Sequence, residues 1–230
     1  MSLSELLQTH SQSVSQFKQL TKPHSRRTDV LVLRYCISYP HVEDAVKAYE
    51  EGNVIRAKYG LDIEKLPDLR HPVYEDLGFF KDRFYTFNRF TGASYGEIVK
   101  QMGEDEEDFL KTSLLLRERC QRLMDEHSIK HNVLTRMISF VEDKGRSVFD
   151  MNMTFLNRSG KASKMSSVLF PQLQDKIIYL DPGLIVSALS KLAKIVMYKH
   201  SKFFCSDRKK LHDILTEDVV EFLKETNVYG

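Results

Sequence analysis

The sequence contains few of the residues that mark long linkers or disulfide frameworks. Six prolines and ten glycines among 230 residues leave little room for extended flexible segments. The three cysteines, Cys36, Cys120 and Cys205, are widely spaced and odd in number, and none forms a CxxC pair or a zinc-binding spacing. We therefore expect free thiols in a reducing compartment and no structural metal.

The sequence also lacks a recognisable targeting or membrane-spanning segment. Residues 1–5 show no basic region followed by an apolar run, which a secretory signal would require. The most apolar stretch, residues 184–198, is interrupted by Lys191 and Lys194 and is too short and too charged to cross a bilayer. An intracellular protein, cytoplasmic or nuclear, is predicted.

The overall composition is that of an ordinary folded chain. Hydrophobic residues make up 42% and charged residues 29%, which excludes wholesale disorder and a coiled-coil rod. A chain of this length buries roughly 70% of its unfolded surface, enough for one large domain or two small ones.

The first half of the chain predicts helices. Residues 1–27 read as an amphipathic arm, and residues 29–37 fit either a strand or a buried helix. A helix is expected from His41 to just before Gly60. The aromatic and basic segment 74–90 fits core packing or, alternatively, stacking on nucleic-acid bases.

Three helices are predicted next, followed by a hairpin. Suitable N-caps and stops lie at Ser94, Gly103, Asp105, Ser128 and Gly145. A β-hairpin is suggested by alternating residues at 149–155, a turn at 157–160 and a second stretch at 165–170. A short strand is expected at 176–180. Three further helices are expected to begin after Asp181, Asp207 and Thr216.

These patterns predict a mainly α fold with a central β-hairpin. The expected organisation is an N-terminal arm (1–27), a helical domain (28–145) and a hairpin with basic C-terminal helices (146–230), the last two possibly forming one continuous domain.

Two segments resemble helix-turn-helix elements. Residues 94–103 are similar to the first helix and turn of the fourth region of bacterial sigma factors, but five acidic residues at 104–108 open the next helix and would repel DNA. Residues 129–145 with the predicted hairpin at 147–170 are similar to the recognition helix and wing of winged-helix proteins. This second resemblance implies DNA contacts by the helix and by a basic wing tip.

Charge is distributed unevenly although the net charge is only +2. Residues 61–110 contain six basic and twelve acidic residues, whereas residues 144–210 contain thirteen basic and four acidic ones. Such asymmetry suggests a polyanion-binding face, although neutralisation of one block by the other remains an alternative.

No local signature of an enzyme is present. His127 and His131 have the spacing of paired metal ligands, but no third ligand lies at a suitable distance. The sequence has no phosphate-binding glycine loop, nucleophile elbow or dinucleotide motif. We therefore predict no catalytic residues, cofactor, metal or small-molecule substrate, while an active site assembled from distant residues stays open.

The sequence thus predicts a nucleic-acid-binding protein, of DNA or RNA, that uses its basic half for phosphate contacts. The alternative is a self-associating protein assembled through the acidic and basic blocks, and an anionic membrane surface is a third possible partner. The residues expected to bind nucleic acid are Lys130, Arg136, Arg158, Lys161, Lys164, Lys191, Lys194, Lys199, Lys202, Arg208, Lys209 and Lys210.

Overall fold

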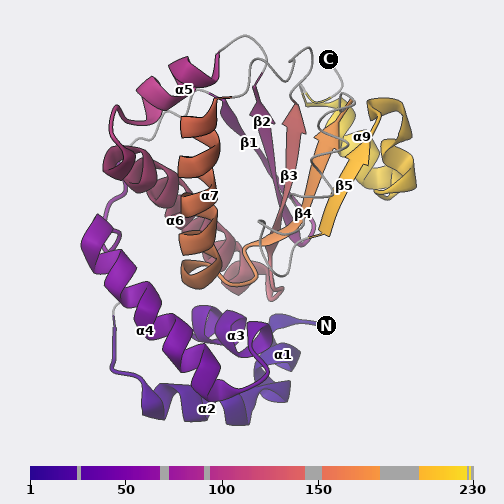
Figure 1. Cartoon of the computed structure of the whole chain (residues 1–230). Helices are drawn as coiled ribbons and strands as arrows, with labels where there is room; N and C mark the ends of the chain where they lie inside the picture. Colours follow the sequence, from indigo (N-terminus) through magenta and orange to yellow (C-terminus); the bar gives the residue numbers. More distant parts are fainter. Residues whose placement is uncertain are drawn as a thin grey trace.

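The computed structural model describes residues 1–24, 27–67, 73–90, 94–142, 152–181, 202–226 and 228. Helices alone form the N-terminal part: α1 (Leu3–Thr9), α2 (Ser11–Leu20), α3 (Asp29–Ser38) and α4 (Val42–Tyr59). They lie together beneath the rest of the molecule, and α4 rises from this layer towards the helices above (Figure 1).

Local sequence signals explain where these helices begin and end. Ser2 and Glu5 form a capping box at the start of α1, and the Thr28 side chain caps α3. The segment whose periodicity was ambiguous, residues 29–37, is the buried helix α3. The predicted helix before Gly60 is confirmed, because Gly60 ends α4 in the left-handed conformation.

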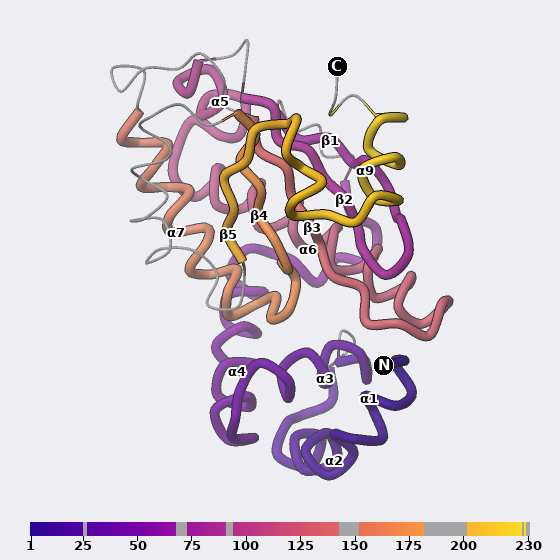
Figure 2. Tube along the Cα trace, turned by 90° about the vertical axis from the view of Figure 1, so that its right-hand side faces the viewer, coloured from indigo at the N-terminus to yellow at the C-terminus, as the bar shows by residue number. Residues whose placement is uncertain are grey.

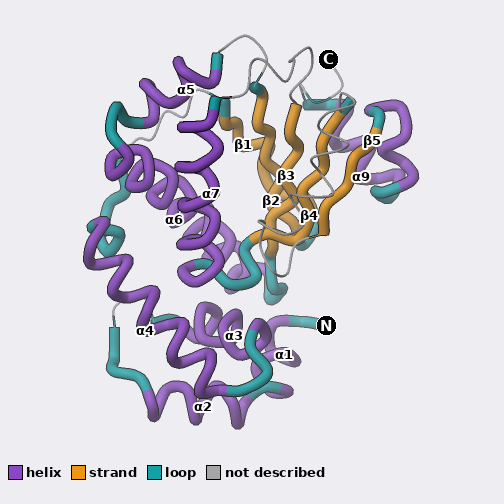
Figure 3. The backbone as a smooth tube through the Cα atoms, in the orientation of Figure 1, coloured by secondary structure: helices purple, strands orange, loops and turns teal. Residues whose placement is uncertain are grey.

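A five-stranded mixed sheet forms the centre of the molecule (Figure 3). Its strands lie side by side in chain order, with β1 and β2 antiparallel and the other pairs parallel. Their bounds are β1 (Tyr74–Phe80), β2 (Arg83–Arg89), β3 (Arg136–Glu142), β4 (Gln174–Leu180) and β5 (Lys202–Ser206).

Helices flank the sheet on both sides. Helices α5 (Tyr95–Met102) and α6 (Glu106–His131) connect β2 to β3, and α7 (Met153–Leu169) lies between β3 and β4. The 3-10 helix η2 (Arg208–Asp213) and helix α9 (Glu217–Lys224) follow β5. Helices α7 and α9 lie on opposite sides of the strands (Figure 2). None of the helices in the described ranges combines the length and apolarity needed to cross a membrane.

The predicted mainly α fold with one central hairpin is wrong, because the structure has an α/β architecture with a five-stranded mixed sheet. The expected helix break at Ser128 does not occur. Helix α6 continues to His131, and Asn132 ends it in the left-handed conformation. The segment expected to be the recognition helix contains strand β3, and six of its seven residues are buried. A strand buried on both faces carries a continuous apolar run, which periodicity cannot distinguish from a buried helix.

The predicted hairpin is also misplaced. Helix α7 occupies the segment assigned to its turn and second strand, and residues 153–155 of its first strand are helical too. The remaining part of that strand, residues 149–151, lies outside the described residues. The hairpin that exists is β1–β2, built from the aromatic segment 74–90, and its rings pack in the core.

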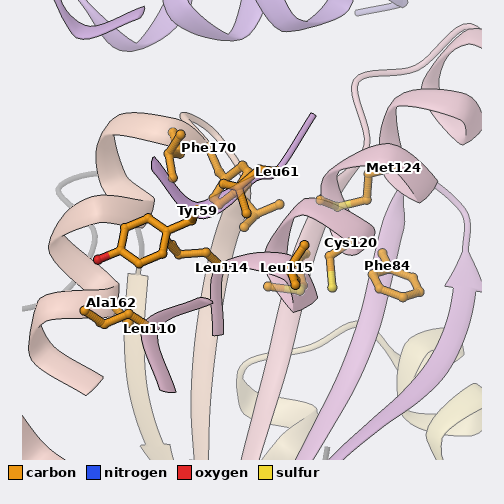
Figure 4. Close-up of a cluster of buried hydrophobic side chains, with 13 residues drawn as sticks. Tyr59, Leu61, Phe84, Leu110, Leu114, Leu115, Cys120, Met124, Ala162 and Phe170 are labelled. Carbon is orange, nitrogen blue, oxygen red and sulfur yellow. The ribbon is translucent and has the colours of Figure 1, made fainter. Parts of the chain in front are cut away.

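Side chains from alternate strand positions build a different cluster on each side of the sheet. On the side of α6 and α7, here called the helix side, Phe84 and Met137 pack against Leu114, Met124 and Phe170 (Figure 4). On the opposite side, strand residues pack against η2, α9 and Val228; they are Tyr85, Phe87, Ile138, Phe140, Ile178 and Leu180. Burial on both faces is what a largely parallel sheet requires.

A buried arginine joins the N-terminal helices to the sheet. Arg34 of α3 is fully buried, and its Nε lies 3.0 Å from Oδ1 of Asp125 in α6. Its other nitrogens donate to the Thr135 carbonyl oxygen (2.8 Å) and the Gln172 carbonyl oxygen (3.2 Å). These two carbonyls lie just before β3 and β4, so one guanidinium ties the amino ends of two strands to α3 and α6.

Replacing Arg34 by methionine should lower the free energy of unfolding by about 3–5 kcal/mol, because it leaves the buried Asp125 carboxylate without its cationic partner and two carbonyls without this donor. Urea denaturation measures the change. The matched control is Lys18→Met, which removes an exposed ion pair with Asp29 and should cost at most about 1 kcal/mol. Equal losses in the two variants would contradict this role for Arg34.

His127 is the histidine whose titration the fold alters most clearly. Its ring stacks on Phe79 at 4.2 Å, and its Nδ1 lies 2.9 Å from the Thr135 hydroxyl. Burial lowers the pKa of His127 below its ordinary 6.5, and the neighbouring His131 and Lys130 lower it further. The folded state therefore holds the neutral ring.

Since the unfolded chain takes up this proton at a higher pH than the folded chain, stability should fall as the pH drops below about 6.5. The variant His127→Phe keeps the ring stacking and removes the proton site. Its unfolding free energy should depend less on pH than that of the wild type between about pH 7 and pH 5. Urea denaturation across this range gives the comparison, and parallel pH profiles would exclude the effect.

Candidate functional site

The helix side of the sheet is covered unevenly. The apolar cluster beneath α6 and α7 takes its strand side chains from β1, β2 and β3, and within the described residues it takes none from β4 or β5. Helix α7 packs against α4, α6 and α5. On the helix side, the side chains of β4 and β5 therefore lie outside the core that α6 and α7 cover.

Five of these side chains form a continuous patch, here called the apolar strip: Val141, Ile177, Tyr179, Phe203 and Cys205. Tyr179 lies opposite Val141 on one side and Cys205 on the other, while Ile177 lies opposite Phe203. The rings of Tyr179 and Phe203 are in contact, with centroids 5.0 Å apart. Both rings are half-buried, and Cys205 is exposed.

Buried polar side chains adjoin the strip but satisfy one another. The hydroxyls of Thr86 and Ser139 are 2.9 Å apart, and Gln174 Nε2 donates to Ser139 Oγ (3.1 Å) and to the Lys176 carbonyl oxygen (2.6 Å). All three side chains are nearly inaccessible. Val141 and Ile177 are buried, so the strip offers the Tyr179 and Phe203 rings and one thiol. This combination is suited to binding an apolar molecule rather than to acid–base chemistry.

The three thiols differ sharply in their surroundings. Burial raises the pKa of both Cys36 and Cys120 to about 11, and the Cys120 sulfur lies 3.0 Å from the Tyr74 hydroxyl. Cys205 is free and exposed on the strip. At neutral pH the reactive thiol is therefore the one that lies on the strip.

A charged cluster joins the carboxyl ends of the strands. Arg208 pairs with Glu142 at the end of β3, and its Nε lies 3.0 Å from Oδ2 of Asp181, the residue after β4. Its Nη1 donates to the Val228 carbonyl oxygen at 2.8 Å. Burial lowers the pKa of Arg208, and the nearby Arg89 guanidinium lowers it further. With two arginines and two carboxylates, this cluster balances its own charge and holds the strand ends together.

The acidic segment 104–108 is paired within the chain. Lys161 Nζ lies 2.7 Å from Glu106 Oε1, and Lys58 Nζ lies 2.9 Å from Glu107 Oε1. Arg158 donates to the carbonyl oxygens of Gly103 and Glu104, both at 3.1 Å. Helices α7 and α4 thus each pair a lysine with one carboxylate of this segment, and Arg158 binds its backbone.

The basic residues expected to bind nucleic acid do not share one surface. Lys130 and Arg136 lie near the amino end of β3, Lys202 begins β5, and Arg208 belongs to the cluster at the carboxyl ends. Arg158 and Lys161 bind the acidic segment. The other described ones are exposed on α7 and η2, namely Lys164, Lys209 and Lys210, and Lys210 lies 3.5 Å from Asp207. Lys191, Lys194 and Lys199 lie outside the described residues.

Sequence reasoning missed the strip, although part of its signal was present. Residues 176–180 were expected to form a strand, and β4 confirms this. Phe203 was read as the end of a helix opened by Asp181, whereas it lies in β5 beside Tyr179. Only the pairing of β4 with β5 brings these two aromatic residues together.

One solved structure, "Crystal structure of Sfh5", matches the chain with a TM-score of 0.61 and 15% sequence identity. The match covers 92% of this chain and 81% of that one. No family model and no curated protein matches the sequence. At this identity the likeness concerns the fold alone.

This likeness corrects the predicted function. The predictions of DNA or RNA binding and of helix-turn-helix elements are wrong, because the chain has the fold of Sfh5 and strand β3 occupies the segment assigned to the recognition helix. The predicted self-association is also not supported, because the acidic segment is paired within the chain and does not need a neighbour's basic helix. What the comparison establishes for this chain is a fold like that of Sfh5, with a mixed sheet flanked by helices.

Proposed function

We propose that the protein binds a small lipid against the apolar strip. Its fold is that of Sfh5, a Sec14-family lipid-binding protein. The observation that carries the proposal is the accessible part of the strip, where the Tyr179 and Phe203 rings are half-buried and Cys205 is exposed next to a packed core. This reading replaces the expectation that no small-molecule ligand exists.

The strip has the physical properties that a lipid site needs. Ligand sites are lined mainly by hydrophobic and aromatic side chains with a few polar groups. A lipid chain laid along the half-buried rings of Tyr179 and Phe203 would remove apolar surface from water, which contributes roughly 25 cal/mol for each Å² buried. The opposite side of the sheet offers no comparable surface among the described residues, since η2, α9 and Val228 pack on it.

Cys205 provides a direct test of occupancy, because the other two thiols are buried with pKa values of about 11. The protein is incubated with phosphatidylcholine vesicles that carry a fluorescent phosphatidylcholine, and the vesicles are then removed. At about pH 7, Cys205 of this protein should react with a maleimide roughly tenfold more slowly than Cys205 of untreated protein. Mass spectrometry follows the labelling.

The control places a thiol far from the strip, on the exposed Lys47 position of α4, in the variant Lys47→Cys/Cys205→Ser. Its labelling rate should not change with lipid. If lipid slows both thiols equally, or slows neither, the strip is not where lipid binds.

Removing one ring of the strip should weaken lipid capture. Phe203→Ser deletes the ring that stacks on Tyr179, so retention of the fluorescent lipid after gel filtration should fall about tenfold, with a small change in the unfolding free energy because the ring is only half-buried. Leu20→Ser, which alters an exposed apolar residue of α2, is the matched control and should retain lipid normally. Normal retention by Phe203→Ser would contradict the proposal.

A further inference from the structure

Each of the four parallel strands carries a cation near its amino end. Arg83, Arg136 and Lys202 are the first residues of β2, β3 and β5, and Lys176 is the third residue of β4. Arg83 lies directly opposite Arg136, and Lys176 lies directly opposite Lys202. Like charges placed directly opposite each other on neighbouring strands destabilise a sheet, so each pair needs an explanation.

The arginine pair has its own counterion. Asp175 places one carboxylate oxygen 3.0 Å from Arg83 Nε and the other 3.4 Å from Arg136 Nη1. Asp175 itself is buried, which strengthens its attraction for both guanidiniums. The repulsion between these two arginines is therefore offset within the sheet.

The lysine pair has no such counterion. In the described part of the chain, neither Lys176 nor Lys202 forms an ion pair with an acidic side chain. The connection between β4 and β5, residues 182–201, contains no Asp or Glu and has three lysines. The Lys176 ammonium lies over the Phe204 ring, 5.8 Å from its centroid, which keeps it on the side of the sheet where Lys202 lies.

We propose that the Lys176–Lys202 pair binds a phosphate group. A dianion between two ammonium groups converts their mutual repulsion into two attractions, and Lys202 is exposed enough to receive it. The ligand is a phosphate dianion, either the phosphomonoester of a lipid headgroup or free inorganic phosphate. The lysines project from the opposite side of the sheet to the apolar strip, so this site is independent of the proposed lipid site.

Inorganic phosphate tests the site directly. Titrated at constant ionic strength against chloride, it should raise the melting temperature of the wild type and bind at least tenfold more weakly to Lys176→Gln/Lys202→Gln. The control variant Lys47→Gln/Lys111→Gln removes two exposed helical lysines and should respond as the wild type does.

Stability without phosphate separates binding from a structural role. In phosphate-free buffer at low salt, the Lys176→Gln/Lys202→Gln variant should be at least as stable as the wild type, because a repulsion has been removed. If it is less stable there, or if phosphate stabilises it as much as the wild type, or if the wild type does not respond to phosphate, the proposal is overturned.

Vesicles distinguish the two sources of the phosphate group. If the source is a headgroup, the wild type should sediment with phosphatidylcholine vesicles containing phosphatidic acid and not with phosphatidylcholine alone, and the double lysine variant should lose this binding. If the source is free phosphate, the melting shift appears without vesicle binding. The Phe203→Ser variant should keep the phosphate response whether or not the variant still retains lipid. Failure of the proposed lipid site can therefore be distinguished from failure of the proposed phosphate site.

Discussion

The structure depends on one constraint, which is that a largely parallel sheet must be covered on both faces. On one side the C-terminal elements meet this requirement, with η2, α9 and Val228 packing against strand residues that include Tyr85 and Phe140. On the helix side the core beneath α6 and α7 covers β1 to β3. The difference between the two sides is what makes the apolar strip on β4 and β5 a candidate ligand surface.

The charges of the chain follow a pattern of local pairing. The acidic segment that opens α6 is held by Arg158 and Lys161 of α7 and by Lys58 of α4. Arg208 is held by carboxylates at the ends of β3 and β4. Lys176 and Lys202 face each other across β4 and β5, and within the described residues neither has an acidic partner that would offset their repulsion.

Much of the secondary structure could be predicted from local signals. The capping box at Ser94, the glycine at the end of α4 and the short apolar run in β4 each indicate an element through residues close together in the chain. The region from Ser128 to Phe170 could not be predicted in this way. Strand β3 is apolar on both faces, and α7 is rich in serine and short of apolar residues, so neither has the periodicity that normally identifies it.

The candidate site was hidden for the same reason. Tyr179 and Phe203 are separated by more than twenty residues, and nothing in the local pattern of either one indicates that they stack. Their contact follows from the parallel pairing of β4 with β5, which is a long-range interaction. The uneven charge distribution led to a wrong prediction of a nucleic-acid-binding surface. A count of charges along the chain cannot show that Arg158 and Arg208 are bound by groups from distant segments.

The sequence by itself determined the composition of a folded chain, the ends of several helices and the uneven distribution of charge, because these depend on single residues or on neighbours. Only the tertiary structure decided the order of the strands, the side of the sheet on which the apolar strip lies and the pairing of the lysines. Sheet register joins residues far apart in the chain, and a change of one position would move every side chain to the other face. Both proposed sites therefore depend on the pairing of strands rather than on any local motif.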